Sequence, residues 1–125
     1  MRRTNQGSNW IRRSTRLAIY ARDGFKCVYC GARARPGKGA KNAHCWAAHL
    51  DHVLASELGG ASTPDNLVTA CGACNSAKRE LPLSGFLADV TRRGGNAEAI
   101  ADRVRAALRA PLDRAEGRRL AAQGK

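Results

Sequence analysis

Four of the five cysteines form two pairs with the same spacing, which is typical of a metal site. Forty residues separate Cys27-x-x-Cys30 from Cys71-x-x-Cys74, and each pair has a glycine beside it. Two thiolates at this spacing bind one ion from a tight turn, and two such pairs supply the tetrahedral ligand set of structural zinc. Because four thiolates leave no open coordination position, we expect the Zn²⁺ ion to stabilise the fold and not to catalyse a reaction. The alternative is four buried free thiols, and Cys45 is expected to be a core residue.

The sequence also holds a carboxylate, an imidazole and a carboxamide close to these cysteines. Asp51 and His52 are adjacent, so they need a strand end or a bend to act together, because neighbours in a regular strand point to opposite faces. Asn75 directly follows the last cysteine, at the start of an expected helix whose N-terminus favours an anion. Lys78 and Arg79 lie one turn farther on and are predicted to contact phosphate.

The formal net charge of +12 predicts a polyanionic partner, nucleic acid above all. The excess is greatest in residues 1–26, which carry seven basic side chains and one acidic side chain. Because each neutralised phosphate releases counterions, such a segment favours nucleic-acid binding. Arg12 and Arg13 are therefore further candidate contacts. The alternative is a merely soluble basic protein from an arginine-rich genome.

The chain has the length of one domain, but alanine makes up much of its hydrophobic content. Of 125 residues, 23 are alanine and 22 are valine, isoleucine, leucine, methionine or phenylalanine. Such a core buries little area, so a metal staple is expected. The basic N-terminus has no apolar segment behind it and no apolar run could span a bilayer, so we expect a cytoplasmic protein without membrane contact. In that reducing compartment, paired cysteines bind metal more often than they form disulfides.

Caps and turn residues divide the chain into three predicted segments. Residues 1–13 are expected to be a flexible basic arm, residues 14–82 to hold the site, and residues 83–125 to form a helical extension. Residues after Pro111 are charged and alanine-rich, and are expected to be helical at most in part. The expected elements are a helix over 14–22, strands over 25–31, 44–53 and 66–70, a short helix over 75–80, and helices over 84–93 and 96–110.

The motifs of the central segment, taken as a set, resemble those of the HNH endonuclease family. They are Leu50-Asp51-His52-Val53, Gly59-Gly60, Asn66-Leu67-Val68 and Cys71-x-x-Cys74-Asn75-x-x-Lys78. The resemblance is closest to the zinc-stapled members, which are common as free-standing phage and bacterial proteins. It implies an α+β protein with a small ββα-metal, treble-clef-like core, stapled by the four-cysteine zinc site and flanked by an N-terminal helix and C-terminal helices.

The resemblance also implies a role for each polar residue of the site. Asp51 and Asn75 would hold a catalytic divalent ion, and His52 would be the general base that activates the attacking water. Asn66 would brace the loop between the two strands through hydrogen bonds. Hard oxygen ligands suit Mg²⁺ or Mn²⁺, and a histidine with an ordinary pKa of about 6.5 takes a proton at neutral pH. Asn75 stands where other members have histidine, which shifts the metal preference toward these two ions.

Two functions follow, and the intact set of Asp51, His52 and Asn75 favours the first. The first is a metal-dependent endonuclease that hydrolyses phosphodiester bonds in double-stranded DNA, by nicking or by double-strand cleavage. The alternative is a non-catalytic zinc module that binds nucleic acid or a phage packaging protein. A monomer and a dimer both fit the sequence, as do roles in packaging, homing and restriction.

Overall fold

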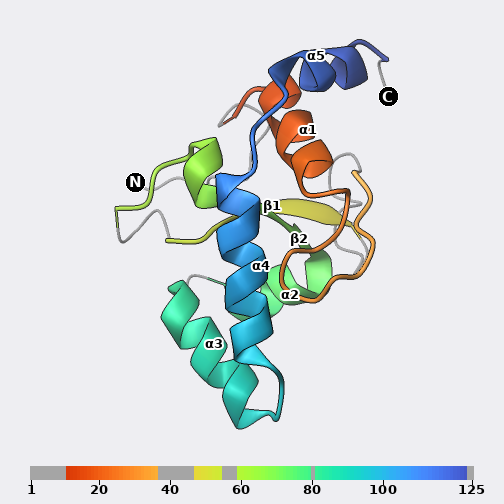
Figure 1. The fold of residues 1–125 in the computed structure, drawn as a ribbon. Coiled ribbons are helices and arrows are strands. Elements are labelled where there is room, and N and C mark those ends of the chain that lie inside the picture. The colour runs from red at the N-terminus through yellow and green to blue at the C-terminus, as the bar shows by residue number, and fades with distance from the viewer. Residues whose placement is uncertain (1–10, 37–46, 55–58, 80, 124–125) are drawn as a thin grey trace.

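The computed structural model describes residues 11–36, 47–54, 59–79 and 81–123 of the chain (Figure 1). Helices and one two-stranded sheet make up this part, which confirms the predicted α+β class. No helix among these residues is both long and apolar enough to cross a membrane. The elements are, in order, α1 (Arg13–Arg22), β1 (Ala48–His52), η3 (Pro64–Asn66), β2 (Leu67–Cys71), α2 (Gly72–Lys78), α3 (Leu83–Arg92), α4 (Ala97–Arg109) and α5 (Arg114–Ala122).

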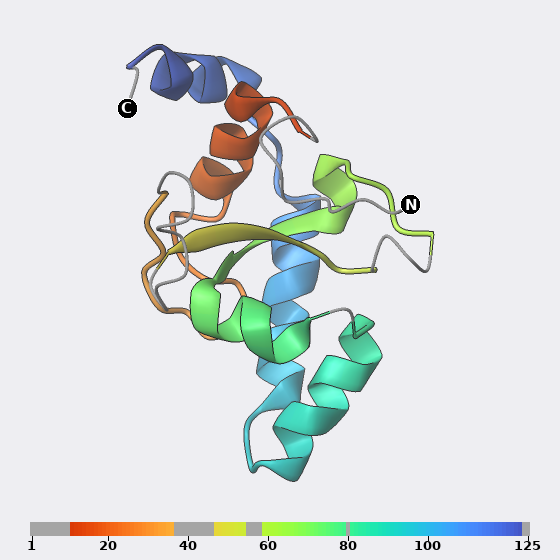
Figure 2. The same ribbon diagram turned by 180° about the vertical axis from the view of Figure 1, so that it is seen from behind.

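The two strands form the centre of the molecule. They are antiparallel, with Ala48 opposite Cys71 and His52 opposite Leu67. Because α2 follows β2 without a break, β1, β2 and α2 form the expected ββα unit. Helix α4 crosses the strands in Figures 1 and 2, and α2 lies beside them. Val68 of β2 packs in one cluster with Val104 of α4, and its strand partner Asp51 contacts Lys78 of α2, so the two helices meet the same face of the sheet.

One core cluster joins the first cysteine pair to β2, α3 and α4. The ring of Tyr29 meets that of Phe86 edge to face, with 5.1 Å between the centroids. Val104 of α4 is buried in the same cluster. Arg103 of α4 donates hydrogen bonds to the carbonyl oxygens of Val28 (2.9 Å) and Tyr29 (2.5 Å). Helix α4 is therefore held against the segment that carries the first cysteine pair.

The C-terminal end of α1 is fixed to β2 by a buried ion pair. Arg22 Nε lies 2.7 Å from Asp23 Oδ1, and these side chains are 2% and 0% exposed. Arg22 also donates to the carbonyl oxygens of Pro64 (2.9 Å) and Leu67 (2.7 Å). Asp23 Oδ2 accepts a hydrogen bond from the backbone N–H of Thr69 (2.9 Å). The pair thus satisfies backbone groups at the start of β2, and its two charges compensate each other away from water.

The residues after Pro111 form a complete helix, although their composition predicted partial helicity at most. Asp113 caps α5 by accepting a hydrogen bond from the N–H of Glu116 (3.0 Å). Helix α5 packs against α1 (Figure 1), and a β-carbon at Gly117 would lie only 2.2 Å from the carbonyl oxygen of Ser14. The cap and this close approach stabilise a helix that has too few apolar residues to be predicted from its pattern.

The expected strand over residues 25–31 is wrong. In this segment an isolated bridge pairs Lys26 with Arg33, and Phe25 has a φ of 55°, which interrupts the extended backbone. The strand expected from residue 44 is described from Ala48 onward. Residues 44–46, which include Cys45, and residues 1–10 of the predicted basic arm lie outside the described part of the chain.

Candidate active site

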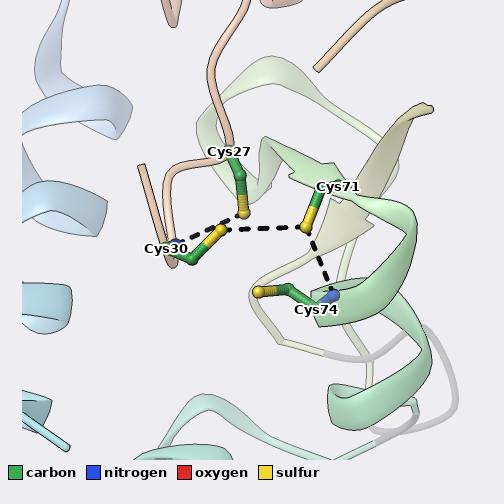
Figure 3. A group of neighbouring side chains, drawn as sticks. All are labelled: Cys27, Cys30, Cys71 and Cys74. Carbon is green, nitrogen blue, oxygen red and sulfur yellow. Dashed lines mark hydrogen bonds between the residues drawn. The ribbon is translucent and has the colours of Figure 1, made fainter. Parts of the chain in front are cut away.

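The four predicted metal ligands lie together. The sulfur atoms of Cys27, Cys30, Cys71 and Cys74 are all within 4.8 Å of one another, and their side chains are directed toward a common centre (Figure 3). Cys30 Sγ and Cys71 Sγ, one from each pair, are 3.8 Å apart. A tetrahedron with Zn–S bonds of about 2.3 Å has edges of about 3.8 Å. The cluster therefore has the composition and the size of a four-thiolate zinc site.

The two cysteine pairs share the same local hydrogen bonding. The first sulfur of each pair accepts the backbone N–H of the second, Cys30 N–H to Cys27 Sγ and Cys74 N–H to Cys71 Sγ, both at 3.4 Å. A hydrogen bond from the Cys74 thiol lowers the pKa of Cys27 to about 5. Donors directed at the sulfurs favour the thiolate form, which is the form that binds metal. Cys27 is thus favoured as a thiolate, whereas burial raises the pKa of Cys30 and the hydrogen bond with Cys27 raises that of Cys74.

Asp51 lies on β1 and receives one hydrogen-bond donor from each cysteine-bearing segment. The Tyr29 hydroxyl, between the cysteines of the first pair, lies 2.5 Å from Asp51 Oδ2. The ammonium of Lys78, four residues after the last cysteine, lies 3.0 Å from the same oxygen. Lys78 also donates to the backbone carbonyl of His52 at 2.9 Å. Both cysteine-bearing segments therefore position the carboxylate of Asp51, a residue that is 6% exposed.

Burial sets the protonation of this group of side chains. It raises the pKa of Tyr29 well above its ordinary value, and the negative charge of Asp51 raises it further, so Tyr29 keeps its proton and is the donor. Burial also raises the pKa of Asp51, while the Lys78 charge and the Tyr29 hydrogen bond act in the opposite direction. The Lys78 ammonium is bound to the Asp51 carboxylate, so the two opposite charges compensate each other in a buried site.

The prediction that Lys78 contacts phosphate does not agree with its position. Its side chain is 0% exposed, because the ammonium turns inward to Asp51 and to the backbone of β1. The neighbouring residue, Arg79, is exposed at the C-cap of α2, with a φ of 50°. Arg12 and Arg13, at the start of α1, are exposed as well. These three arginines are accessible to a nucleic acid, whereas Lys78 is not.

His52 is the last residue of β1, which meets the requirement for a strand end at the adjacent Asp51 and His52. Its Nε2 lies 3.0 Å from the hydroxyl oxygen of Ser62, in the segment that leads to η3. The residue is 7% exposed, and a bend follows at Val53 and Leu54. Ser62 thus fixes the orientation of the imidazole, a contact for which the sequence carries no signal.

Asn66 closes the connection between the strands. Its Oδ1 accepts the N–H of Leu54 (2.9 Å), and its Nδ2 donates to the carbonyl oxygens of Leu54 (3.0 Å) and Ala61 (2.9 Å). Gly60 is required beside it, since a β-carbon there would lie 1.7 Å from the carbonyl oxygen of Leu54. These three hydrogen bonds are of the kind that the family resemblance implies for this position.

Asn75 is the middle residue of α2, because the helix begins at Gly72 and not at Asn75 as expected, and it is half-buried. It precedes Lys78 by three residues, so the two side chains lie on one face of the helix. Because Lys78 contacts Asp51, this is the face that α2 turns toward the end of β1. Sequence reasoning missed Tyr29 as well as Ser62, and the place of Tyr29 between the two cysteines of a pair was an available signal.

Comparison with known families agrees with this geometry. Residues 27–80 match the model of the HNH endonuclease family. The matched span contains both cysteine pairs, both strands and α2, together with Asp51, His52, Asn66 and Asn75. A search of curated proteins found no match to the chain.

Proposed function

We propose that the protein is a metal-dependent DNA endonuclease, and the match of residues 27–80 to the model of the HNH endonuclease family supports this. The observation that carries the proposal is the position of Asp51. Its carboxylate is held at the end of β1 by donors from both cysteine-bearing segments, next to His52 and facing the helix that carries Asn75. A module that only binds nucleic acid has no need of this arrangement.

In the proposal, the four cysteines hold a structural Zn²⁺. The ion would join the segment before β1 to the junction of β2 and α2, two parts of the chain that otherwise meet through a small core. Because Tyr29 and Lys78 extend from those same parts to Asp51, the zinc would also fix the geometry of the reaction centre. The four cysteines, with zinc bound, would therefore affect the chemistry indirectly, by placing the side chains that surround the carboxylate.

Asp51 and Asn75 would hold the catalytic ion, Mg²⁺ or Mn²⁺, through a carboxylate and a carboxamide oxygen. Such hard oxygen ligands suit both ions. The contacts of Tyr29 and Lys78 fall on Oδ2 of Asp51, so Oδ1 would be the oxygen available to the ion. When bound, the ion supplies Lewis-acid stabilisation of the phosphate and of the leaving oxygen.

His52 is the proposed general base. Its imidazole would take a proton from the water that attacks the phosphorus atom, while the Ser62 hydroxyl keeps the ring in one orientation. Asn66 acts on this step through the backbone, because its hydrogen bonds hold the turn that follows His52. The attack forms a phosphorus–oxygen bond to the water oxygen and breaks one ester bond of the DNA, and the leaving oxygen takes up a proton from solvent to become a hydroxyl group.

Cleavage of a supercoiled plasmid tests the proposal. We expect zinc-loaded protein to convert the plasmid to nicked or linear product in Mg²⁺ or Mn²⁺ and to leave it intact when neither ion is added. A brief excess of EDTA should stop the reaction, and renewed Mg²⁺ should restore it while zinc stays bound. Binding of the plasmid without cleavage in either ion would contradict the nuclease proposal and favour the non-catalytic zinc module.

A further inference from the structure

The start of α1 and the adjoining part of α5 enclose a polar hollow outside the HNH segment. Its lining residues are Arg12, Ser14 and Thr15 from the α1 side and Arg114 and Arg118 from α5. The cavity volume is about 290 Å³. At about 30 Å³ per water molecule, this space holds roughly ten waters. It is large enough for one phosphate group with part of its hydration shell, and lies below the usual range of pockets for drug-sized ligands, about 300–1,000 Å³.

The charge of the hollow is not compensated. Within the described part of the chain, none of its three arginines has a carboxylate within ion-pair distance, whereas four other arginines each pair with an aspartate or a glutamate. The acidic residues of α5 are engaged elsewhere. Asp113 accepts the N–H of Glu116 as the helix cap, and Glu116 pairs with Arg119. Three guanidinium groups therefore face one hollow with no described anion to balance them.

The walls of the hollow are held in place by close packing. Gly117 of α5 lies against the first turn of α1, where a β-carbon would meet the carbonyl oxygen of Ser14 at 2.2 Å. Arg114 Nη1 approaches the hydroxyl oxygen of Thr15 at 3.4 Å. Leu120 packs against the core cluster that includes Leu17. Since these contacts fix α5 on α1, the backbone positions from which the arginines extend are set before any ligand binds.

We propose that this hollow binds a backbone phosphate of the DNA and anchors the duplex at a distance from the cleavage centre. Guanidinium groups bind phosphate oxygens in a bidentate manner, and the hydroxyls of Ser14 and Thr15 supply the further donors that backbone contacts commonly use. Helices α1 and α5 lie at one end of the molecule and α3 at the other, with the sheet between them (Figures 1 and 2). The choice of DNA as the ligand rests on the proposed function. Because the hollow would contact the phosphate backbone and no base, it would not contribute to sequence preference.

A pair of matched double variants tests the anchor. Arg12→Gln with Arg118→Gln removes two charges from the hollow, and neither side chain has a hydrogen bond among the described residues, so the fold should persist. Arg92→Gln with Arg93→Gln removes the same charge from the end of α3. Affinity for a fluorescent DNA duplex is measured by anisotropy over a range of salt concentrations, without Mg²⁺ or Mn²⁺. We expect the first variant to weaken binding about tenfold and to lower the salt slope by about 1 to 2, with a much smaller change in the control.

Two results would overturn the anchor. Equal weakening by both double variants would mean that only net charge matters, and unchanged affinity of the first variant would mean that the hollow does not bind DNA. The assay measures binding and does not depend on cleavage. If the protein binds DNA without cutting it, the nuclease proposal is contradicted, and the anchor can still be tested. If cleavage is observed, the variant should raise KM and leave kcat at the wild-type value, since the hollow does not touch the scissile phosphate.

Discussion

Replacement of Cys71 by serine is expected to unfold the protein at room temperature. Cys71 is buried, closes β2 and caps α2, and its sulfur lies 3.8 Å from Cys30 Sγ in the cluster. Structural zinc in small domains contributes about 10–16 kcal/mol of apparent binding free energy. That matches or exceeds the whole free energy of unfolding of an ordinary domain, about 5–15 kcal/mol. Loss of one thiolate therefore removes more stabilisation than the alanine-rich core can supply.

Far-UV circular dichroism and zinc content measure this effect together. Ala73→Ser is the matched control, because it introduces the same side chain at an exposed position between Cys71 and Cys74. We expect one zinc per chain and a native spectrum for the wild type and the control, and little zinc and an unfolded spectrum for the Cys71 variant. Removal of zinc from the wild type with a strong chelator should give the same unfolded spectrum. A Cys71 variant that melts cooperatively without zinc would show that the cluster is not a structural metal site.

The second large effect is expected at the buried pair of Asp51 and Lys78. The Asp51→Asn variant leaves the Lys78 ammonium without its counterion in a site where the lysine side chain is 0% exposed. Breaking a buried ion pair in this way costs about 3–5 kcal/mol. Lys78→Met should also destabilise, since it leaves the Asp51 carboxylate with only the Tyr29 hydroxyl as a described donor. The double variant removes both charges. Its loss in free energy of unfolding is therefore expected to be smaller than the sum of the losses of the two single variants.

Urea unfolding of the four zinc-loaded proteins, without Mg²⁺ or Mn²⁺, gives the coupling free energy directly. Groups in contact couple by about 0.5–3 kcal/mol, and we expect a value near the upper end because both charges are buried. Additive losses within about 0.5 kcal/mol would mean that the two charges do not depend on each other. The zinc content of each variant is the control, because a variant that has lost zinc reports on the cluster and not on the pair.

The sequence was most informative where the chain is constrained locally. The spacing of the cysteines predicted the sulfur cluster, and Asn96, whose Oδ1 accepts the N–H of Ala99 (3.0 Å), marked the start of α4. Gly24 and Gly94, with φ of 71° and 84°, follow the ends of α1 and α3 as expected. Spacings, caps and positive-φ glycines act over a few residues, so the sequence carries them directly.

Long-range contacts were the part that the sequence could not supply. Lys78 has the charge and the spacing of a phosphate contact, and only the approach of α2 to β1 turns its ammonium inward to Asp51. The sequence suggests no more than a core aromatic at Tyr29, whereas in the structure a carboxylate of β1 lies 2.5 Å from its hydroxyl. Helix α5 depends on Gly117 fitting against α1, which no periodicity in its own residues reveals. In each case the decisive partner lies more than twenty residues away in the chain.

In the proposed cleavage reaction His52 takes the proton of the attacking water, and the His52→Ala variant measures that contribution. Single-turnover cleavage of plasmid DNA in Mg²⁺ is compared among zinc-loaded wild type, His52→Ala and, as a control on the same strand, His49→Ala. General-base catalysis contributes about 10²- to 10⁴-fold, so we predict a loss of that size for His52→Ala, with zinc content and DNA affinity retained and His49→Ala close to wild type. Cleavage by the folded His52 variant at the wild-type rate would mean that His52 is not the general base.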